Sequence, residues 1–379
     1  MQPKSLAVLL IACTCAGAAW LVGRNDAVPH DPLAPVVEEG ERKPAVHDGV
    51  PEKYRETIAK GLAYLVKQQH ANGHWVGDDG QHPMAMTGLV GLALLMDKDT
   101  PTGRLAPSKQ HKHIEPLRKA VNWLLEKRKT GGDGLLFSGH PSERTRYMEG
   151  HGLATILLAG ALNKETGERR ARLAEALEHA VKVIAKAQST QGGWYHTSKV
   201  EGHDFDAVLP TAIQVQALQA AENAGIAIPG GALRAGYEYL TAIATKARPG
   251  KDGSLLPIAA ALVYVNGPKH ADSEATEWDR QFAATRSLLP IGASLKFGRD
   301  DLTHYYFAQA AFHQGKDVWP QYRNALFDQV QAAQNKDGSW PASTGLGVGS
   351  VYATALWCTV LQLERESHSS MAPRIVIID

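Results

Sequence analysis

Apolar residues at three- and four-residue spacing run through most of the chain beyond its first fifty residues. Within 52–70, for example, Tyr54, Ile58 and Leu62 recur at the interval of one helix face. Segments of this amphipathic kind alternate with segments such as 84–97 that are apolar nearly all round, which is typical of buried helices. Sustained period-two alternation is absent from the sequence, so we expect an all-α protein.

The predicted helices form pairs of one amphipathic and one less polar member. The amphipathic segments, which we expect on the outside, are 52–70, 112–129, 168–187, 231–247 and 317–334. The less polar segments, which we expect inside, are 84–97, 147–162, 206–224, 254–265, 279–296, 303–313 and 349–364. Inner helices that are apolar on all sides favour a closed double ring of roughly six helical hairpins over an open solenoid.

A seven-residue motif, Gln-x-x-x-Gly-x-Trp, occurs three times, each time after an amphipathic segment, at 69–75, 188–194 and 334–340. Its glutamine falls in the last helical turn, where a carboxamide can bind carbonyls that lack partners. The glycine permits a left-handed turn, and the indole covers that turn between successive hairpins. We interpret the tryptophans as structural clamps, with a sugar- or lipid-binding surface as the functional alternative.

The turn glycines recur at a nearly constant period. Gly73, Gly134, Gly192 and Gly253 are separated by 61, 58 and 61 residues. The turns at Gly134 and Gly253 carry leucine where the others carry tryptophan, so we interpret them as degenerate copies. A period of this length predicts a repeat architecture.

The three complete motifs, which end in Trp75, Trp194 and Trp340, resemble the QW motifs of the squalene and oxidosqualene cyclases. Prenyltransferase β subunits share the α/α toroid of those cyclases. The resemblance covers residues 51–366 as a repeat pattern. It implies an α/α toroid with a central cleft, and it does not specify an activity. We expect this cleft to bind an apolar or glycan ligand, or a protein partner.

The same resemblance implies where cyclase chemistry would lie. Class II cyclases protonate a polyene with an Asp-x-Asp-Asp motif at the start of an inner helix, and the nearest match is Asp204-Phe205-Asp206, followed by Ala207. The proton donor there needs a neighbouring carboxylate and a shielded site to stay protonated. Because the third aspartate is missing, we expect Asp204 or Asp206 to cap the helix that follows. A terpene cyclase with a reduced acid motif is the alternative.

Polar residues also gather at the starts of two inner helices. Glu143, Arg144, Arg146, Tyr147, Glu149 and His151 surround one start, and His203, Asp204 and Asp206 precede the next. Carboxylates with histidine at one end of a cavity suit general acid–base work on a sugar or a polyene. Some α/α toroids are polysaccharide lyases or glycoside hydrolases, and a ring of helix caps and salt bridges is the structural alternative. The candidate catalytic residues are Glu149, His151, His203, Asp204 and Asp206.

Metal and cofactor sites are not expected. Cys358 is the only cysteine after residue 15, and it lacks the Asp-x-Cys context of the prenyltransferase zinc site, so we interpret it as a core residue. The pair Asp300-Asp301 is interpreted as a helix cap. The stretch 110–113, with two histidines, is interpreted as a solvated loop.

The first residues predict export. Residues 1–23 combine Lys4, an apolar run and a small-residue site at 16–18, as in a secretory signal, and the run is nearly long enough for a membrane anchor. We interpret 24–50, rich in proline and glutamate, as a disordered linker and 367–379 as a tail. The net charge of +1 gives no reason to expect nucleic acid as a partner. We therefore expect an exported, periplasmic or membrane-tethered protein that meets the membrane only through its N-terminal segment.

Overall fold

The computed structural model describes residues 50–97, 113–130, 134–246, 260, 301–314, 318–342 and 348–365. All of them belong to the second of the two units into which the chain divides, Pro44–Asp379. The predicted signal, the linker up to residue 49, the tail and all but residue 260 of the helices predicted at 254–265 and 279–296 lie outside these residues. Val50, the last residue of the predicted linker, is buried, so the folded part includes it.

All regular structure in these ranges is helical, as the apolar pattern predicts, with ten α-helices and no strand. The amphipathic outer helices are α1 (Glu52–Lys67), α3 (Ile114–Thr130), α5 (Gly167–Ala187), α7 (Ala232–Lys246) and α11 (Val318–Ala332). The inner helices are α2 (Pro83–Leu95), α4 (Tyr147–Leu162), α6 (Val208–Asn223), α10 (Asp301–Gln314) and α12 (Gly349–Leu361). Single 3-10 turns lie outside the α-helices, at η1 (Asp78–Gly80), η2 (Pro141–Glu143), η3 (Lys199–Glu201), η4 (Pro229–Gly231) and η5 (Leu363–Arg365).

Burial separates the two kinds of helix. The outer helix α1 buries one face, through Tyr54, Ile58, Leu62 and Leu65. In the inner helix α4, by contrast, Glu149 is the one residue that is not buried. None of the described helices is long and apolar enough to cross a membrane.

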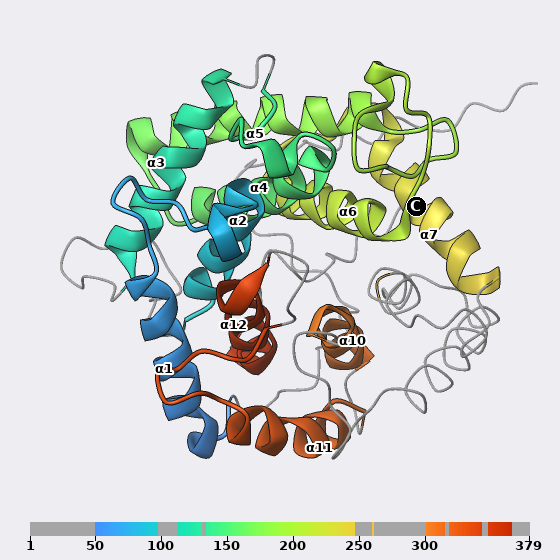
Figure 1. Ribbon diagram of the computed structural model, residues 1–379. Coiled ribbons are helices and arrows are strands. Elements are labelled where there is room, and N and C mark those ends of the chain that lie inside the picture. The colour runs from blue at the N-terminus through green and yellow to red at the C-terminus, as the bar shows by residue number, and fades with distance from the viewer. Residues whose placement is uncertain are drawn as a thin grey trace, which may run out of the picture. The chain divides into compact units, whose positions relative to one another are not determined.

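The inner helices pack on one another in series: α6 on α4, α4 on α2, α2 on α12 and α12 on α10 (Figure 1). The last inner helix in the chain therefore packs against the first, and the last outer helix, α11, likewise contacts α1. Glycine allows the closest of these approaches. A Cβ on Gly88 of α2 would lie 2.6 Å from the main chain of Leu153 on α4, so the two helices could not pack at this distance with a larger residue there.

The turn motif forms the same joint at all three places. In the second copy, Gln188 Nε2 donates to the carbonyls of Gly192 and Ala232, both at 2.8 Å. Ala232 is the first residue of the next outer helix, so the carboxamide joins the turn to a neighbour. The other copies pair Gln69 with Gly73 and Pro116, and Gln334 with Gly338 and Thr57. Because Thr57 lies in α1, the third copy ties α11 to the first helix of the series.

The motif tryptophans are fully buried, in agreement with the structural interpretation. Trp194 Nε1 donates to the carbonyl of Ile184 at 2.7 Å, and its backbone N–H donates to Thr211 Oγ1 at 2.9 Å. Trp75 and Trp340 make the equivalent two bonds. With no exposed indole surface, none of the three can form a sugar- or lipid-binding face.

The degenerate copy of the motif at Gly134 forms the same turn but uses different residues for its hydrogen bonds. Gly134 has φ of +98°, close to the +91° of Gly192. The backbone N–H of Leu136 donates to His151 Nδ1 at 3.0 Å, in the place of the bond from tryptophan to threonine. His151 Nε2 lies 3.2 Å from the carbonyl of Ala180 on α5, so the imidazole joins α4 to α5. Its burial lowers its pKa to about 4.

Candidate functional site

Asp204 and Asp206 brace the turn that precedes them. Asp204 accepts hydrogen bonds from the backbone N–H and Oγ1 of Thr190, both at 2.8 Å, and Asp206 accepts one from the hydroxyl of Ser189. The residue before α6 is Ala207, and no side chain caps that helix, so the capping prediction is wrong. The bonds from Thr190 lower the pKa of the exposed Asp204 carboxyl, the opposite of what a proton donor needs.

The two candidate histidines have different surroundings. His203 is exposed, and its Nδ1 is 2.6 Å from Thr197 Oγ1. His151 is fully buried in the joint at Leu136. His151 therefore lies inside the core, whereas Glu149 stands among other titratable groups at the edge of the core.

Glu149 lies in the first turn of α4, and one of its carboxylate oxygens contacts two basic side chains. Its Oε1 lies 2.5 Å from His196 Nδ1 and 3.2 Å from Arg146 Nε. Its Oε2 is buried and has no hydrogen-bond partner among the residues that the structure describes. The Glu149 side chain is 13% exposed and that of His196 is 22% exposed, so the pair lies at the boundary between core and solvent. A buried carboxylate oxygen without a donor is costly, and a donor from a bound molecule would relieve that cost.

His82 approaches the same carboxylate from the loop before α2. Its backbone is left-handed, with φ of +53°, which is rare for a non-glycine residue and strained before Pro83. The backbone N–H of His82 donates to Ser142 Oγ at 2.9 Å, which holds this conformation. Burial lowers the pKa of His82, Arg146 lowers it further and Glu149 opposes both, so the ring lies within electrostatic reach of the site. Backbone strain of this kind gathers at functional sites.

An aromatic ridge borders the Glu149–His196 pair. The ring of Tyr195 lies 4.6 Å from that of His196 and 5.6 Å, edge to face, from that of Phe205. Phe205 is 58% exposed and Val200 is 73% exposed, and these are the exposed large hydrophobic side chains in the described ranges. Both belong to the connection that carries His196, so apolar surface and titratable groups occur side by side.

Two members of the predicted polar cluster hold this arrangement in place. Glu143 is buried and accepts a 2.6 Å hydrogen bond from the backbone N–H of Met84, in the first turn of α2, and its burial raises its pKa. Tyr147 Oη donates to Glu201 and accepts from the backbone N–H of Ser198, both at 2.7 Å. Both side chains thus hold loops around Glu149 in place. For these two residues the structural alternative, a network of polar contacts at the helix starts, applies.

Neither His196 nor His82 was predicted from the sequence. The signal for His196 was a departure from the repeat, since Trp194 is followed by Tyr195-His196 whereas Trp75 is followed by Val-Gly and Trp340 by Pro-Ala. For His82 no pattern pointed to function, because its significance lies in a backbone conformation that the residue type disfavours.

The remaining candidates for metal or redox chemistry lie in the core. Cys358 is a buried free thiol, as predicted, and burial raises its pKa. Asp301 is buried and accepts a 3.0 Å hydrogen bond from Trp357 Nε1, while Asp300 lies outside the described residues. His113 is buried 2.9 Å from Asp97, so the prediction of a solvated loop is wrong at this residue. Among the described residues no three histidine, cysteine or acidic side chains are grouped as a metal site would need.

Comparison with known proteins adds no relative. No protein-family model matches the chain, and a search of the curated proteins finds no match either. The resemblance to the cyclase repeats therefore rests on the turn motifs alone.

Proposed function

We propose that this chain is an exported or membrane-tethered α/α-toroid protein of the squalene cyclase and prenyltransferase repeat type. In this proposal it binds a glycan where the inner helices begin, around Glu149. The observation that carries the proposal is the buried Oε2 of Glu149, which lacks a donor. The Oε1 of the same carboxylate bonds His196, whose ring lies against Tyr195 of the aromatic ridge. Export rests on the signal-like features of residues 1–23.

Two observations support the toroid. The turn joint repeats with the same donors and acceptors at Gln69, Gln188 and Gln334, as a repeat architecture requires. The contacts of α12 with α2 and of α11 with α1 bring the last described hairpin against the first. Contact between the last described hairpin and the first is what a closed ring would require.

The chemistry around Glu149 favours a glycan over a purely apolar ligand. A sugar ring presents C–H groups that pack on an aromatic face and hydroxyls that donate to a carboxylate. Phe205 and Tyr195 supply the first contact, and the free oxygen of Glu149 supplies the acceptor for the second. An apolar molecule would leave that oxygen buried without a donor.

A second function, acid–base cleavage of the bound glycan, is favoured by the hydrogen bond between Glu149 and His196. A carboxylate held by an imidazole can move a proton to or from a sugar oxygen. Class II cyclase chemistry has less support, because Asp204 has a lowered pKa and stands in an exposed position.

The test is binding of the full chain to a panel of neutral and acidic glycans. Phe205→Ala and Glu149→Gln should each weaken the best ligand about tenfold, roughly 1.4 kcal/mol. Val200→Ala, on the same loop and more exposed, is the matched control and should bind as the wild type does. If no glycan binds, or if Phe205→Ala binds as tightly as the control, the proposal fails.

The same panel decides between binding and cleavage. If the wild type shortens any polysaccharide and Glu149→Gln loses that turnover while keeping affinity within about tenfold, the cleavage function holds. If the wild type binds a glycan without turnover, the protein is a binding protein. A polyprenoid substrate should be left unchanged, and its cyclisation would contradict the glycan proposal.

A further inference from the structure

Buried polar atoms without partners occur on inner helices beyond Glu149. The Oε2 of Glu149 is one of them. Tyr305 Oη on α10 and Gln216 Oε1 on α6 are likewise buried, and neither has a hydrogen-bond partner in the described part of the chain. Tyr305 is 1% exposed and Gln216 is 2% exposed. Because a buried donor or acceptor without a partner is costly, these atoms point to a ligand that carries polar groups.

A chain of two carboxamides fixes which atom of Gln216 is free. Gln309 Nε2 donates to the carbonyl of Tyr305 at 3.0 Å, and Gln309 Oε1 accepts from Gln216 Nε2 at 3.2 Å. A main-chain carbonyl can only accept, so the orientation of both carboxamides follows, and Gln216 Oε1 is left as an acceptor without a donor. Since α6 and α10 are the two ends of the packing series of inner helices, this chain joins those ends (Figure 1).

Tyr306 and Tyr352 connect these atoms to Glu149. The ring of Tyr306 lies 5.1 Å, edge to face, from that of Tyr305. Burial raises the pKa of Tyr306, and nearby groups, Tyr352 and Glu149 among them, raise it further, so the four side chains lie within electrostatic reach of one another. Tyr352 is half-buried and lies in the first turn of α12, as Glu149 does in α4. These two are the partly exposed members of the group, so a ligand would enter beside them.

We propose that the Glu149 site continues between the inner helices as a subsite for the terminal residue of a glycan, a single neutral sugar. This subsite rests on the proposed glycan function. A sugar hydroxyl both donates and accepts, so one hydroxyl can donate to Glu149 Oε2 or Gln216 Oε1 while another accepts from Tyr305 Oη. Because Tyr305 and Gln216 are buried, a glycan can reach them only with its end. A uronic acid would bring a second carboxylate beside Glu149, and the side chains further in carry no positive charge to balance it.

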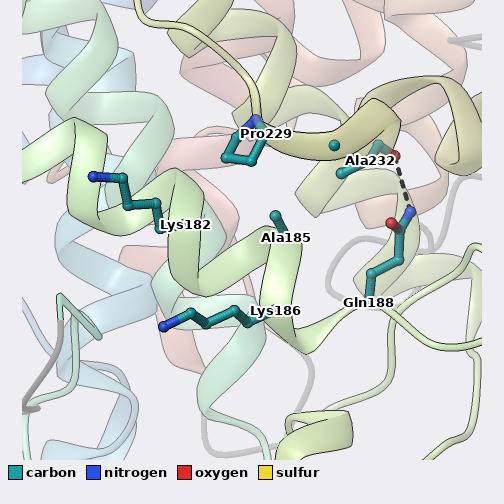
Figure 2. A pocket seen from close by; sticks show the side chains of 7 residues that line it. Lys182, Ala185, Lys186, Gln188, Pro229 and Ala232 are labelled. Carbon is teal, nitrogen blue, oxygen red and sulfur yellow. Dashed lines mark hydrogen bonds between the residues drawn. The ribbon is translucent and has the colours of Figure 1, made fainter.

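The depression between α5, η4 and α7 offers no comparable set of partners (Figure 2). Figure 2 shows the ammonium groups of Lys182 and Lys186 pointing away from it. The carboxamide of Gln188 at its edge already donates to the carbonyl of Ala232. A sugar bound there would leave most of its hydroxyls without a partner from the protein, so the subsite is placed at the inner helices.

The first experiment titrates the full chain in detergent solution with matched monosaccharides, by calorimetry and ligand-observed NMR. The pairs are glucose with glucuronate, galactose with galacturonate, and mannose with mannuronate, which differ only in the oxidation of one carbon. At least one neutral sugar should bind, and its uronate should bind about tenfold more weakly or worse. If no neutral sugar binds up to its solubility limit, or if the uronate binds as tightly as its neutral counterpart, the subsite is refuted.

Two equally buried tyrosines locate the binding. Tyr305→Phe removes a hydroxyl that has no partner, so it should weaken the neutral sugar about tenfold and leave the urea midpoint unchanged or raised. Tyr322→Phe on α11 is the matched control, because its hydroxyl lies 2.7 Å from His304 Nδ1. This control should lower the urea midpoint and leave the sugar affinity unchanged. Unchanged affinity in Tyr305→Phe overturns the proposal.

The subsite and the proposed function fail separately. If Glu149→Gln and Phe205→Ala weaken a glycan that Tyr305→Phe binds as the wild type does, the glycan site remains and the subsite is lost. If the wild type binds no glycan at all, both are lost.

Discussion

The joint at Trp194 and the joint at Leu136 make the same turn with different chemistry. At Trp194 the indole N–H donates to the carbonyl of Ile184 on its own outer helix, and Thr211 receives the backbone N–H. At Leu136 the side chain has no donor, and His151 both receives the backbone N–H and reaches a carbonyl on α5. The indole thus ties its turn to the outer helix directly before it, whereas His151 ties the inner helix α4 to the outer helix α5.

This difference separates the two tasks of the motif tryptophan. One task is to fill the space above the turn, which Leu136 still does, because it is fully buried. The other is to donate a hydrogen bond to the outer helix before the turn; at the Leu136 joint His151 instead bonds a carbonyl of α5, the outer helix that follows. As a consequence, the joint at Leu136 contains a titratable group, His151, where each of the three tryptophan joints has a threonine.

Truncation of Trp194 and Leu136, the side chains that fill the space above the two turns, should have the largest effect on stability. We expect Trp194→Ala to lower the free energy of unfolding by about 4 kcal/mol and Leu136→Ala by about 3 kcal/mol, since both leave a cavity and the indole also loses its bond to Ile184. Urea denaturation measures both, with the exposed Val200→Ala as a control that should change stability by less than about 0.5 kcal/mol. A loss at Trp194 no greater than that at Leu136 would mean that neither the larger volume of the indole nor its bond to Ile184 adds stability.

Lowering the pH should destabilise the joint at Leu136, which contains His151, and should leave the three tryptophan joints unchanged. His151 has a pKa of about 4 in the folded chain, against about 6.5 when unfolded. Between these values the unfolded chain binds more protons, so stability falls as the pH is lowered from about 6.5 to about 4, by roughly 3 kcal/mol for this residue. His304, whose burial also lowers its pKa to about 4, adds a second, similar contribution.

The variant His151→Gln isolates the first contribution. Its carboxamide can accept from Leu136 and donate to Ala180, and it does not titrate. We expect the acid slope of the unfolding free energy to become shallower, while part of it remains because of His304. A slope identical to that of the wild type would show that the joint at Leu136 is not where protons act.

Replacing the motif glutamines should have the smallest effect on stability. It also tests most directly whether the joints are equivalent. Gln334→Ala removes two hydrogen bonds, to Gly338 and Thr57, and should cost about 1–2 kcal/mol of unfolding free energy. Gln188→Ala should cost the same if the joints are equivalent. Gln68→Ala, exposed and one position before a motif, is the control and should have almost no effect. A much larger loss at Gln334 would single out the contact of α11 with α1 as a closure on which the other hairpins depend.

Most of the helical framework was predictable because its signals are local. The helix predicted at 147–162 coincides with α4, and those at 168–187 and 231–247 agree with α5 and α7 within one residue at each end. The structural interpretation of the tryptophans also followed from position alone, since each motif ends an outer helix. These features need only spacing and turn chemistry.

The candidate site was less predictable because it depends on contacts between distant segments. Glu149 was chosen for its place at a helix start, but its partner His196 comes from another loop, 47 residues later. His151, two residues from Glu149, faces the opposite way into the core, and neither residue type nor local spacing distinguishes the two. Aspartate is a common helix-capping residue, which is why Asp204 and Asp206 were predicted to cap α6. Both instead accept hydrogen bonds from the neighbouring turn.

The acceptors at the joints have a consequence for how such a chain can change. The glutamines and the indoles all donate to main-chain carbonyls, such as those of Pro116, Ala232 and Thr57. Every residue carries a carbonyl, so the helix that receives the bond can exchange its side chains without breaking it. A hairpin duplicated or deleted by recombination would meet the same acceptor on its new neighbour. The joint therefore sets how two hairpins meet and leaves their number free.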